Sequence, residues 1–202
     1  MQLAVLVPVK RFTAAKGRLR GVVPDDERAR LARWMAELVL DACDGIERFV
    51  ACDDPVVREW AEAHGATVVW GPELGLNRAV DDGVAEIARL GFDHVIVSHA
   101  DLPLPTALPD VSRADTITLV PDRRLDGTNV MSFPVAHPVA ASYGGGSFRR
   151  HLAAAQRTGA GVEIRRDHSL SIDLDTVDDL RHPLVEEVLP LWLQTNPASR
   201  TH

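Results

Sequence analysis

The sequence predicts a single α/β domain with a mixed, mostly parallel central sheet and helices on both faces. Its 202 residues, 46% hydrophobic and 25% charged, are enough for one substantial core. Residues 3–9 (LAVLVPV) form a continuous apolar run, which is typical of a parallel strand buried on both faces. Strand and helix patterns then alternate, as in parallel sheets. We expect one domain over residues 1–196 and a disordered tail over 197–202.

The elements can be followed along the chain by their hydrophobic periods. The first half predicts strands at 3–9, 46–52, 66–70 and 95–97, and helices at 24–43, 55–64 and 76–90. The second half predicts strands at 115–121, 129–135, 161–166 and 169–176, with helices at 147–157 and 176–180. A parallel half is therefore followed by a mixed half, and ligands of such sheets bind at the carboxyl ends of the strands.

Charge and cysteine usage exclude several classes of protein. The chain has 22 Lys and Arg against 29 Asp and Glu, a net charge of −7, which is unsuited to nucleic acid. Its two cysteines have neither a metal spacing nor a redox spacing, as suits a reducing compartment. The first apolar run is too short for a membrane span and lacks signal-peptide features. We expect a cytoplasmic protein without nucleic-acid or membrane partners, and a homodimer is left open.

A basic loop follows the first strand. It contains Lys10, Arg11, Lys16, Arg18 and Arg20. A charge run alone is more often a solvated surface, but this one leaves the carboxyl end of a buried strand, and the small residues within it permit close backbone approach. It matches neither a Walker A loop nor a G-x-G-x-x-G loop. We predict that it neutralises a triphosphate.

Carboxylates occur at two places where they could hold Mg²⁺. Asp101 follows a buried strand, although an Asp there could also cap the turn before Leu102. Asp173 and Asp175 stand at strand spacing and should project to one face. We expect Asp175 or Thr176 to cap the next helix, and Asp173 to be the stronger metal candidate.

Two helix starts could bind ligand groups. Glycines at 144–146 and Ser147 precede a helix, whose free N–H groups favour an anion, and Thr128 on a neighbouring strand adds a hydroxyl. The alternative is an ordinary turn with Ser147 as the N-cap; His151 could assist as a donor, or be structural. Asn77 either caps its helix or reads a purine edge.

The motifs occur together in one order from residue 3 to 180. They are VPVK (7–10), AKGRL (15–19), GLN (75–77), DDG (81–83), HADLP (99–103), DGTN (126–129), YGGGSFRRH (143–151) and DLDT (173–176). No single motif is specific, but the ordered set resembles the 2-phospho-L-lactate or phosphoenolpyruvate guanylyltransferase family. The resemblance implies a nucleotidyltransferase fold of the glycosyltransferase-A type, and a place in making the deazaflavin coenzyme F-420.

The resemblance also implies roles for individual residues. It puts the nucleotide phosphates on Lys10, Lys16 and Arg18, which with Asp101 would form the catalytic group, and it puts guanine near Asn77. It assigns Mg²⁺ to Asp101 and Asp173, and the acceptor's phosphate to Thr128, Gly146 and Ser147. Two places depart from the family pattern: His99, which could perturb the metal site or simply pack, and the glycine-poor loop 122–126.

The reaction implied is transfer of GMP from GTP to the phosphate of a small phosphorylated carboxylic acid. The acceptor is expected to be phosphoenolpyruvate, because the sequence resembles the bacterial branch; 2-phospholactate and 3-phosphoglycerate differ from it by few atoms. One alternative is a nucleotidyltransferase for a sugar phosphate or a molybdenum cofactor, although those families usually open with a LAAGxGxR-type loop. The other is a non-catalytic nucleotide-binding module, which the intact pair of Asp101 and Asp173 disfavours.

Overall fold

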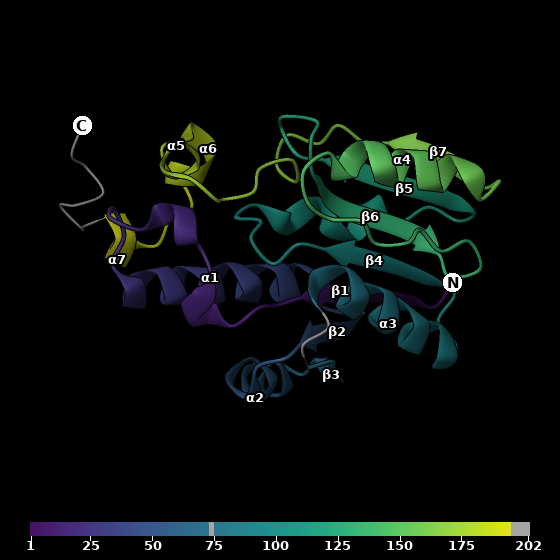
Figure 1. The fold of residues 1–202 in the computed structure, drawn as a ribbon, viewed down its shortest axis with the longest axis horizontal. Coiled ribbons are helices and arrows are strands. Elements are labelled where there is room, and N and C mark those ends of the chain that lie inside the picture. Colours follow the sequence, from purple (N-terminus) through teal and green to yellow (C-terminus); the bar gives the residue numbers. More distant parts are fainter. Residues whose placement is uncertain (73–74, 195–202) are drawn as a thin grey trace.

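A computed structural model describes residues 1–72 and 75–194, which form a three-layered α/β structure around one sheet (Figure 1). The strands are β1 (Leu3–Pro8), β2 (Glu47–Cys52), β3 (Thr67–Trp70), β4 (His94–Ser98), β5 (Thr116–Pro121), β6 (Thr128–Pro134) and β7 (Gly161–Ile164). Their order is β3-β2-β1-β4-β6-β5-β7. Within the described residues only β6 runs against its neighbours. The prediction of a mixed, mostly parallel sheet is confirmed, while the predicted tail lies outside the described residues.

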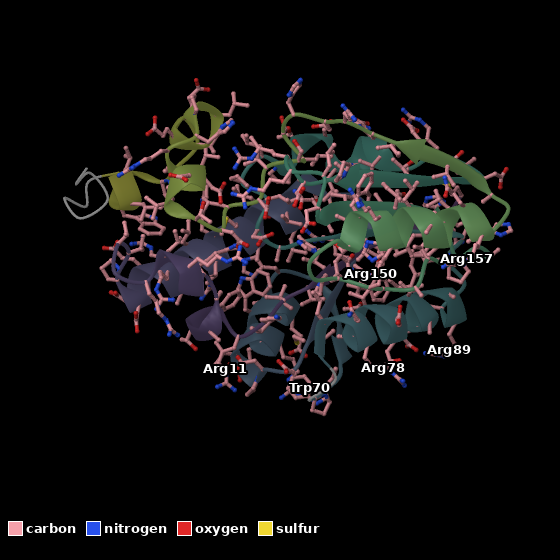
Figure 2. The ribbon with its side chains drawn as sticks, turned by 45° about the horizontal axis from the view of Figure 1, so that its top comes forward. Arg11, Trp70, Arg78, Arg89, Arg150 and Arg157 are labelled. Carbon is pink, nitrogen blue, oxygen red and sulfur yellow. The ribbon has the colours of Figure 1, made fainter. Side chains whose placement is uncertain are left out.

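Helices cover both faces of the sheet, as the sequence predicts. The helices are α1 (Asp25–Ala42), α2 (Pro55–Ala63), α3 (Gly75–Arg89), α4 (Ser147–Arg157), α5 (Val177–Leu180), α6 (Pro183–Glu186) and α7 (Leu191–Gln194), with 3-10 turns η1 (Phe12–Ala14), η2 (Gly17–Leu19) and η3 (Pro105–Val111). One core joins α1, α2 and η3 to the sheet, and another joins α3 and α4 to its other face. Figure 2 shows α3, marked by Arg78 and Arg89, and α4, marked by Arg150 and Arg157.

The contact between α3 and β1 is close because it is made by a glycine. A Cβ at Gly83 would lie 2.7 Å from Cδ2 of Leu6, so a larger residue would require the Leu6 side chain or the helix to move. This contact holds α3 directly over the first strand, and the N-terminal turn of α3 therefore lies near the carboxyl end of β1. The described part of the chain has no helix long and apolar enough to cross a membrane.

The expected strand at 169–176 is wrong, and the reason lies in its hydrogen bonds. Its apolar positions alternate as in a strand, and Leu170, Ile172 and Leu174 are all buried. However, the backbone N–H groups of residues 169 and 170 donate to the carboxylate of Asp167, which makes a turn. The segment then packs its apolar side without a sheet partner, and the N–H of Leu174 donates to the carbonyl of Asp101. The alternation therefore reports burial rather than a β-ladder.

The basic loop after β1 is held in place by a buried arginine of α1. The side chain of Arg28 is 2% exposed, and its guanidinium donates to the carbonyl of Ala15 at 3.0 Å and to the carboxylate of Asp25. Arginine suits this position because its planar fork can serve two acceptors at once. The geometry of the loop around Lys16 therefore depends on Arg28, in the first turn of α1. Arg28 itself lines neither of the two cavities that border Lys16 and Asp175.

Replacing Arg28 with Ala should lower the free energy of unfolding by about 2–3 kcal/mol, because it leaves a cavity and removes the donor to Ala15. Replacing Arg33, an exposed residue of the same helix that forms an i,i+4 bridge with Glu37, should change it by less than about 0.5 kcal/mol. Urea unfolding of both variants checks this difference. Equal stability of the two variants would contradict the anchoring role of Arg28.

Candidate active site

The site forms where the sheet grows in both directions from its first strand. β1 pairs with β2 on one side and with β4 on the other, so the connections leaving β1 and β4 diverge. Such a switch point leaves a crevice at the carboxyl ends of the strands, where open α/β sheets bind ligands. Lys10 follows β1 there and Asp101 follows β4, so residues 91 positions apart in the sequence meet at one edge.

Two adjoining hollows of about 300 Å³ each open at this edge, and together we call them the β1 cleft. Both are lined by residues 8–10 and by Leu76 of α3. Lys16 and Asp101 line the first hollow, and Asp53 lines the second. Ala14 and Ala15 of the basic loop line the cleft, whereas Gly17 does not. Volumes of this size suit ligands as large as a nucleotide.

The ammonium group of Lys16 lies between two carboxylates inside the cleft. Its Nζ is 2.7 Å from Oδ2 of Asp101 and 3.0 Å from Oδ1 of Asp175, and its side chain is only 5% exposed. Lys16 has a left-handed backbone with a φ of 55°, which non-glycine residues adopt rarely. Arg18 lies at the exposed side, 3.4 Å from Asp175. The structure thus brings Lys16, Arg18 and Asp101 of the predicted catalytic group together, and Asp175 pairs with both cations.

The pKa values at this cluster follow from burial and from charge. Burial lowers the pKa of Lys16, but the charges of Asp101 and Asp175 outweigh it and the net shift is upward. Burial raises the pKa of Asp101, but the Lys16 ammonium outweighs it and the net shift is downward. Lys16 and Asp101 are therefore both held in their charged forms at neutral pH.

Asp173 lies beside this cluster without a cation of its own. The pKa of Asp173 is raised, first by burial and then by the negative charge of Asp101. Within the described residues Asp173 makes no ion pair, whereas Asp175 is taken by Lys16 and Arg18. Thr176, not Asp175, caps α5, through a reciprocal bond with Asp179, which frees Asp175 for these cations.

The residues present fit a magnesium ion shared with a ligand. In the described ranges no three His, Cys, Asp or Glu side chains are grouped to hold a metal by themselves. Mg²⁺ usually takes one or two carboxylates and completes its shell with phosphate and water oxygens. Oδ1 of Asp101 is buried and has no hydrogen-bond partner, and Asp173 is near enough for repulsion. These two carboxylates would hold the metal, as the sequence predicts.

A second cavity of about 300 Å³, which we call the β6 pocket, meets the β1 cleft at Asp175 and His99. It is lined by Arg18, His99, Asp122, Arg123, Arg124, Asp126, Gly127, Thr128, Asn129, Tyr143, Gly144, Gly145, Ser147, Asp173, Asp175, Thr176 and Asp179. Thr128 and Ser147 are 1% and 2% exposed, respectively. The structure therefore brings both predicted hydroxyl residues together in a pocket that borders Asp173.

The glycine-rich turn contributes different backbone groups from those expected. Ser147 is the first residue of α4, and Gly146, with a φ of 71°, is the N-cap. The N–H of Gly146 donates to Asp126, and Gly146 does not line the pocket. Gly144 and Gly145 line it instead, and no hydrogen bond given for the described residues uses their N–H groups. These two amides are the free donors of the turn.

An arginine that the sequence analysis missed holds this turn in shape. The guanidinium of Arg150 donates to the carbonyl of Ser142 at 2.6 Å and to the carbonyl of Gly145 at 2.6 Å. Arg150 binds the carbonyls of Ser142 and Gly145 and so fixes the backbone of the turn, while the N–H groups of Gly144 and Gly145 remain available to a ligand. Its signal in the sequence is weak, since Arg150 stands one turn inside an ordinary amphipathic helix.

Two further arginines reach the β6 pocket from the loop 122–126, which the sequence treated as a departure from the family pattern. The carboxylate of Asp122 accepts the N–H groups of residues 124, 126 and 127 and so closes the loop. A Cβ at Gly127 would lie 2.8 Å from this carboxylate, which explains the glycine. Arg123 pairs with Asp179, while Arg124 makes no ion pair among the described residues. In the sequence, the signal for this loop was the pair of Asp122 and Gly127 on either side of the two arginines.

Three other predicted residues have defined places. Lys10 is exposed and lines both hollows of the β1 cleft. His99 packs on the ring of Tyr143 at 4.9 Å, and its Nδ1 lies 3.8 Å from Oδ1 of Asp101, so it both packs and borders the metal candidates. Asn77 lines none of the cavities described above. Its Oδ1 accepts the N–H of Tyr143 at 2.7 Å, which ties α3 to the turn before α4.

The fold is shared with transferases of known structure. A putative nucleotide-diphospho-sugar transferase from Desulfovibrio desulfuricans G20 superposes with a TM-score of 0.75 at 18% identity, over 98% of this chain and 92% of that one. A 4-diphosphocytidyl-2C-methyl-D-erythritol synthase superposes with a TM-score of 0.62 at 13% identity, over 94% and 98%. At these identities the likeness establishes the fold.

Sequence comparison identifies the family. The model of the CofC-like guanylyl transferases matches residues 3–186, and the chain belongs to this family. Phosphoenolpyruvate guanylyltransferase of Conexibacter woesei is 38% identical over 192 residues, 89% of this chain and 86% of that protein. The enzyme of the same name from Sphaerobacter thermophilus is 33% identical, over 89% and 91%. A 2-phospho-L-lactate guanylyltransferase of Methanothermobacter thermautotrophicus is 29% identical, over 89% and 83%.

Asp173 and Asp175 should respond oppositely to replacement by Asn. Asp173→Asn removes an unpaired charge that repels Asp101, so it should raise the stability of the metal-free protein by roughly 1 kcal/mol while abolishing turnover. Asp175→Asn takes a partner from the buried Lys16, so it should lower stability. Thermal unfolding without metal, combined with pyrophosphate release, separates the two variants. Stabilisation by Asp175→Asn would contradict this assignment.

The gain from Asp173→Asn should depend on pH. Because the folded-state pKa of Asp173 is raised, the cost of its charge is absent below its unfolded pKa of about 4 and is complete above its folded pKa. The variant should therefore be more stable than the parent at neutral pH and equal to it near pH 3. A gain that is unchanged across this range would place its cause outside the titration of Asp173.

Proposed function

We propose that this chain is a guanylyltransferase that transfers GMP from GTP to the phosphate of a small phosphorylated carboxylic acid in the biosynthesis of coenzyme F-420. Phosphoenolpyruvate is the acceptor that we favour, because the more similar relatives carry that name. The observation that carries the proposal is the junction of the β1 cleft and the β6 pocket at the Lys16 cluster, with basic residues on both sides. GTP and Mg²⁺ would occupy the first and the acid the second.

The reaction needs no general base. A phosphate monoester is already ionised at neutral pH, so its oxygen can attack the α-phosphorus of GTP directly. The new oxygen–phosphorus bond forms as the bond to the β-phosphate breaks, and pyrophosphate leaves. What the protein must supply is alignment of two anions and compensation of charge that spreads over the phosphoryl oxygens. Bound Mg²⁺ would supply part of that compensation.

Cations of the basic loop would provide the rest. Lys10 makes no ion pair among the described residues, so its ammonium is free for the outer phosphates. Lys16 is fixed at the junction by Asp101 and Asp175, where the α-phosphorus would lie between donor and acceptor. Arg18 lines the β6 pocket and would face the incoming acid. These positions support the catalytic group inferred from the sequence.

The β6 pocket has separate groups for the two ends of the acceptor. The N–H groups of Gly144 and Gly145, with the hydroxyls of Thr128 and Ser147, would hold the phosphate. The unpaired guanidinium of Arg124 would hold the carboxylate, because its planar fork matches carboxylate geometry. All of these groups line one cavity.

Replacing Arg124 with Ala should raise the KM for phosphoenolpyruvate about tenfold and leave the KM for GTP unchanged, because one exposed charge-assisted contact is lost. Replacing Arg157, at the far end of α4, should change neither constant (Figure 2). Steady-state kinetics with each substrate varied in turn gives both numbers. A change confined to the KM for GTP in the Arg124 variant would reverse our assignment of the two subsites.

Base recognition can be assigned to two candidates. The sequence favours Asn77, but the carboxylate of Asp53 lines the second hollow of the β1 cleft and makes no ion pair in the described part of the chain. Guanine presents an N1–H and a 2-amino group, which are donors that a carboxylate can accept together, whereas adenine presents no such pair. We therefore assign the reading of guanine to Asp53 and a positioning contact to Asn77.

Asp53→Asn should reduce the preference for GTP over ATP about tenfold or more, since an unpaired polar group costs on the order of 1–3 kcal/mol. Asn77→Ala should weaken both nucleotides alike, because it loosens the link between α3 and the glycine turn. The ratio of kcat/KM for the two nucleotides distinguishes these outcomes. Loss of the preference in the Asn77 variant alone would return base reading to Asn77.

The test of the whole proposal is incubation with GTP, Mg²⁺ and one acid at a time: phosphoenolpyruvate, 2-phospholactate or 3-phosphoglycerate. Pyrophosphate and the guanylylated acid should form in equal amounts, and fastest with phosphoenolpyruvate. Formation of neither with any of the three acids would overturn the proposed function.

A further inference from the structure

A buried histidine of α4 stands directly behind the β6 pocket. His151 is 0% exposed, and both of its ring nitrogens make hydrogen bonds. Its Nε2 lies 2.9 Å from the backbone nitrogen of Ser142, and its Nδ1 lies 3.0 Å from Oγ1 of Thr128. The sequence left open whether this residue is structural or a donor, and its partners decide between the two.

The bond to Ser142 fixes the position of the ring proton. A backbone N–H can only donate, so Nε2 must accept and cannot carry a proton. In a neutral imidazole the single proton is then on Nδ1, which donates it to the hydroxyl oxygen of Thr128. Protonation of Nε2 would set two N–H groups against each other at 2.9 Å. The geometry therefore specifies one tautomer.

The surroundings keep the ring neutral and fixed. Burial, and then the electrostatic effect of the neighbouring Arg150 and His99, lower the pKa of His151 to about 4. The ring of Tyr143 packs edge-on against the imidazole with centroids 4.9 Å apart, and His99 packs on the same tyrosine. His151 is thus held between the glycine turn and β6 in a single state.

The consequence falls on the hydroxyl of Thr128. Its oxygen accepts the proton from His151 and makes no other hydrogen bond with the described residues. Because Thr128 lines the β6 pocket, its own proton remains available to a ligand there. A phosphate dianion can only accept hydrogen bonds. A hydroxyl whose oxygen already accepts a bond from another group can still donate its own proton to such a phosphate.

We propose that His151 is a positioning residue that orients the Thr128 hydroxyl as a hydrogen-bond donor to the phosphate of the acceptor. The inference rests on the proposed function, since it assigns that phosphate to the β6 pocket. Such orientation matters because the pocket is also lined by the carboxylates of Asp126, Asp173 and Asp175, so the phosphate needs donors that are already directed toward it. A preset donor also spares reorientation when the phosphate binds.

The tautomer can be measured without any turnover. Nitrogen-15 NMR of the free protein, with His151 assigned by comparison with His151→Asn, should show a protonated Nδ1 and an unprotonated Nε2 at neutral pH. Addition of phosphoenolpyruvate should shift the Nδ1–H signal, because the phosphate would polarise the hydroxyl that accepts from it. A proton on Nε2, a charged ring, or no shift at saturating phosphoenolpyruvate would overturn the proposal.

Two amide variants then separate orientation from packing. His151→Asn places an N–H donor near the position of Nδ1, and His151→Gln places its amide near the position of Nε2. The Asn variant should keep the KM for phosphoenolpyruvate within about twofold, whereas the Gln variant should raise it roughly five- to tenfold without a matching change in the KM for GTP. Melting temperatures of both variants control for damage to the fold. Equal effects of the two amides would assign His151 to packing.

Thr128→Val completes the test, because it removes the hydroxyl through which His151 is inferred to act. In that background His151→Gln should have no further effect on the KM for phosphoenolpyruvate, whereas independent contributions would multiply. If no acid supports pyrophosphate release, the proposed function fails, and the NMR titration still decides the contact. If turnover is normal and the two substitutions multiply, the inference fails and the proposed function stands.

Discussion

The bridge from the Lys16 ammonium to Asp101 and Asp175 is the interaction on which the site depends. It joins the side chains of the loop after β1, the end of β4 and the segment before α5, which the pairing of β1 with β4 and the bond from the Leu174 N–H to the Asp101 carbonyl bring to one place. Each partner stabilises the charge of the others, so a buried ammonium and a buried carboxylate can both remain ionised. Without the bridge, the sheet edge would carry carboxylates that repel one another.

Around this bridge the backbone is held by hydrogen bonds to polar side chains rather than by hydrogen bonds between β-strands. Arg28 fixes the basic loop through the carbonyl of Ala15, Asp122 closes the loop that carries Arg124, and Arg150 binds the carbonyls of the glycine turn. Asn129 belongs to the same group, because its Nδ2 donates to the carbonyl of residue 170 at 3.0 Å. Irregular segments near a sheet edge can be rigid when their backbone groups are satisfied in this way. That rigidity is what lets a pocket of loops select a small acid.

The parts of the site that the sequence could predict are those with a local pattern. A buried strand ending in Asp101, and glycines opening a helix at Ser147, can be recognised within a dozen residues. The bridge of Lys16 to Asp175 cannot be predicted in this way, because the two residues are separated by 159 positions and no local motif indicates that they pair. The segment 169–176 was predicted as a strand for a related reason. Its apolar residues do alternate, but they are buried by packing on α1 and the C-terminal helices and not by pairing in a sheet.

The protein has a net charge of −7, which is compatible with binding two anions because most carboxylates near the site already form ion pairs or hydrogen bonds. Asp175 pairs with Lys16 and Arg18, Asp179 pairs with Arg123, and Asp126 accepts the N–H of Gly146. Asp173 is the exception, a carboxylate in the β6 pocket with a raised pKa and no ion pair among the described residues. A metal ion arriving with nucleotide phosphates would remove that repulsion, so the first substrate would lower the electrostatic barrier to the second. Order of binding would then follow from the position of one unpaired charge.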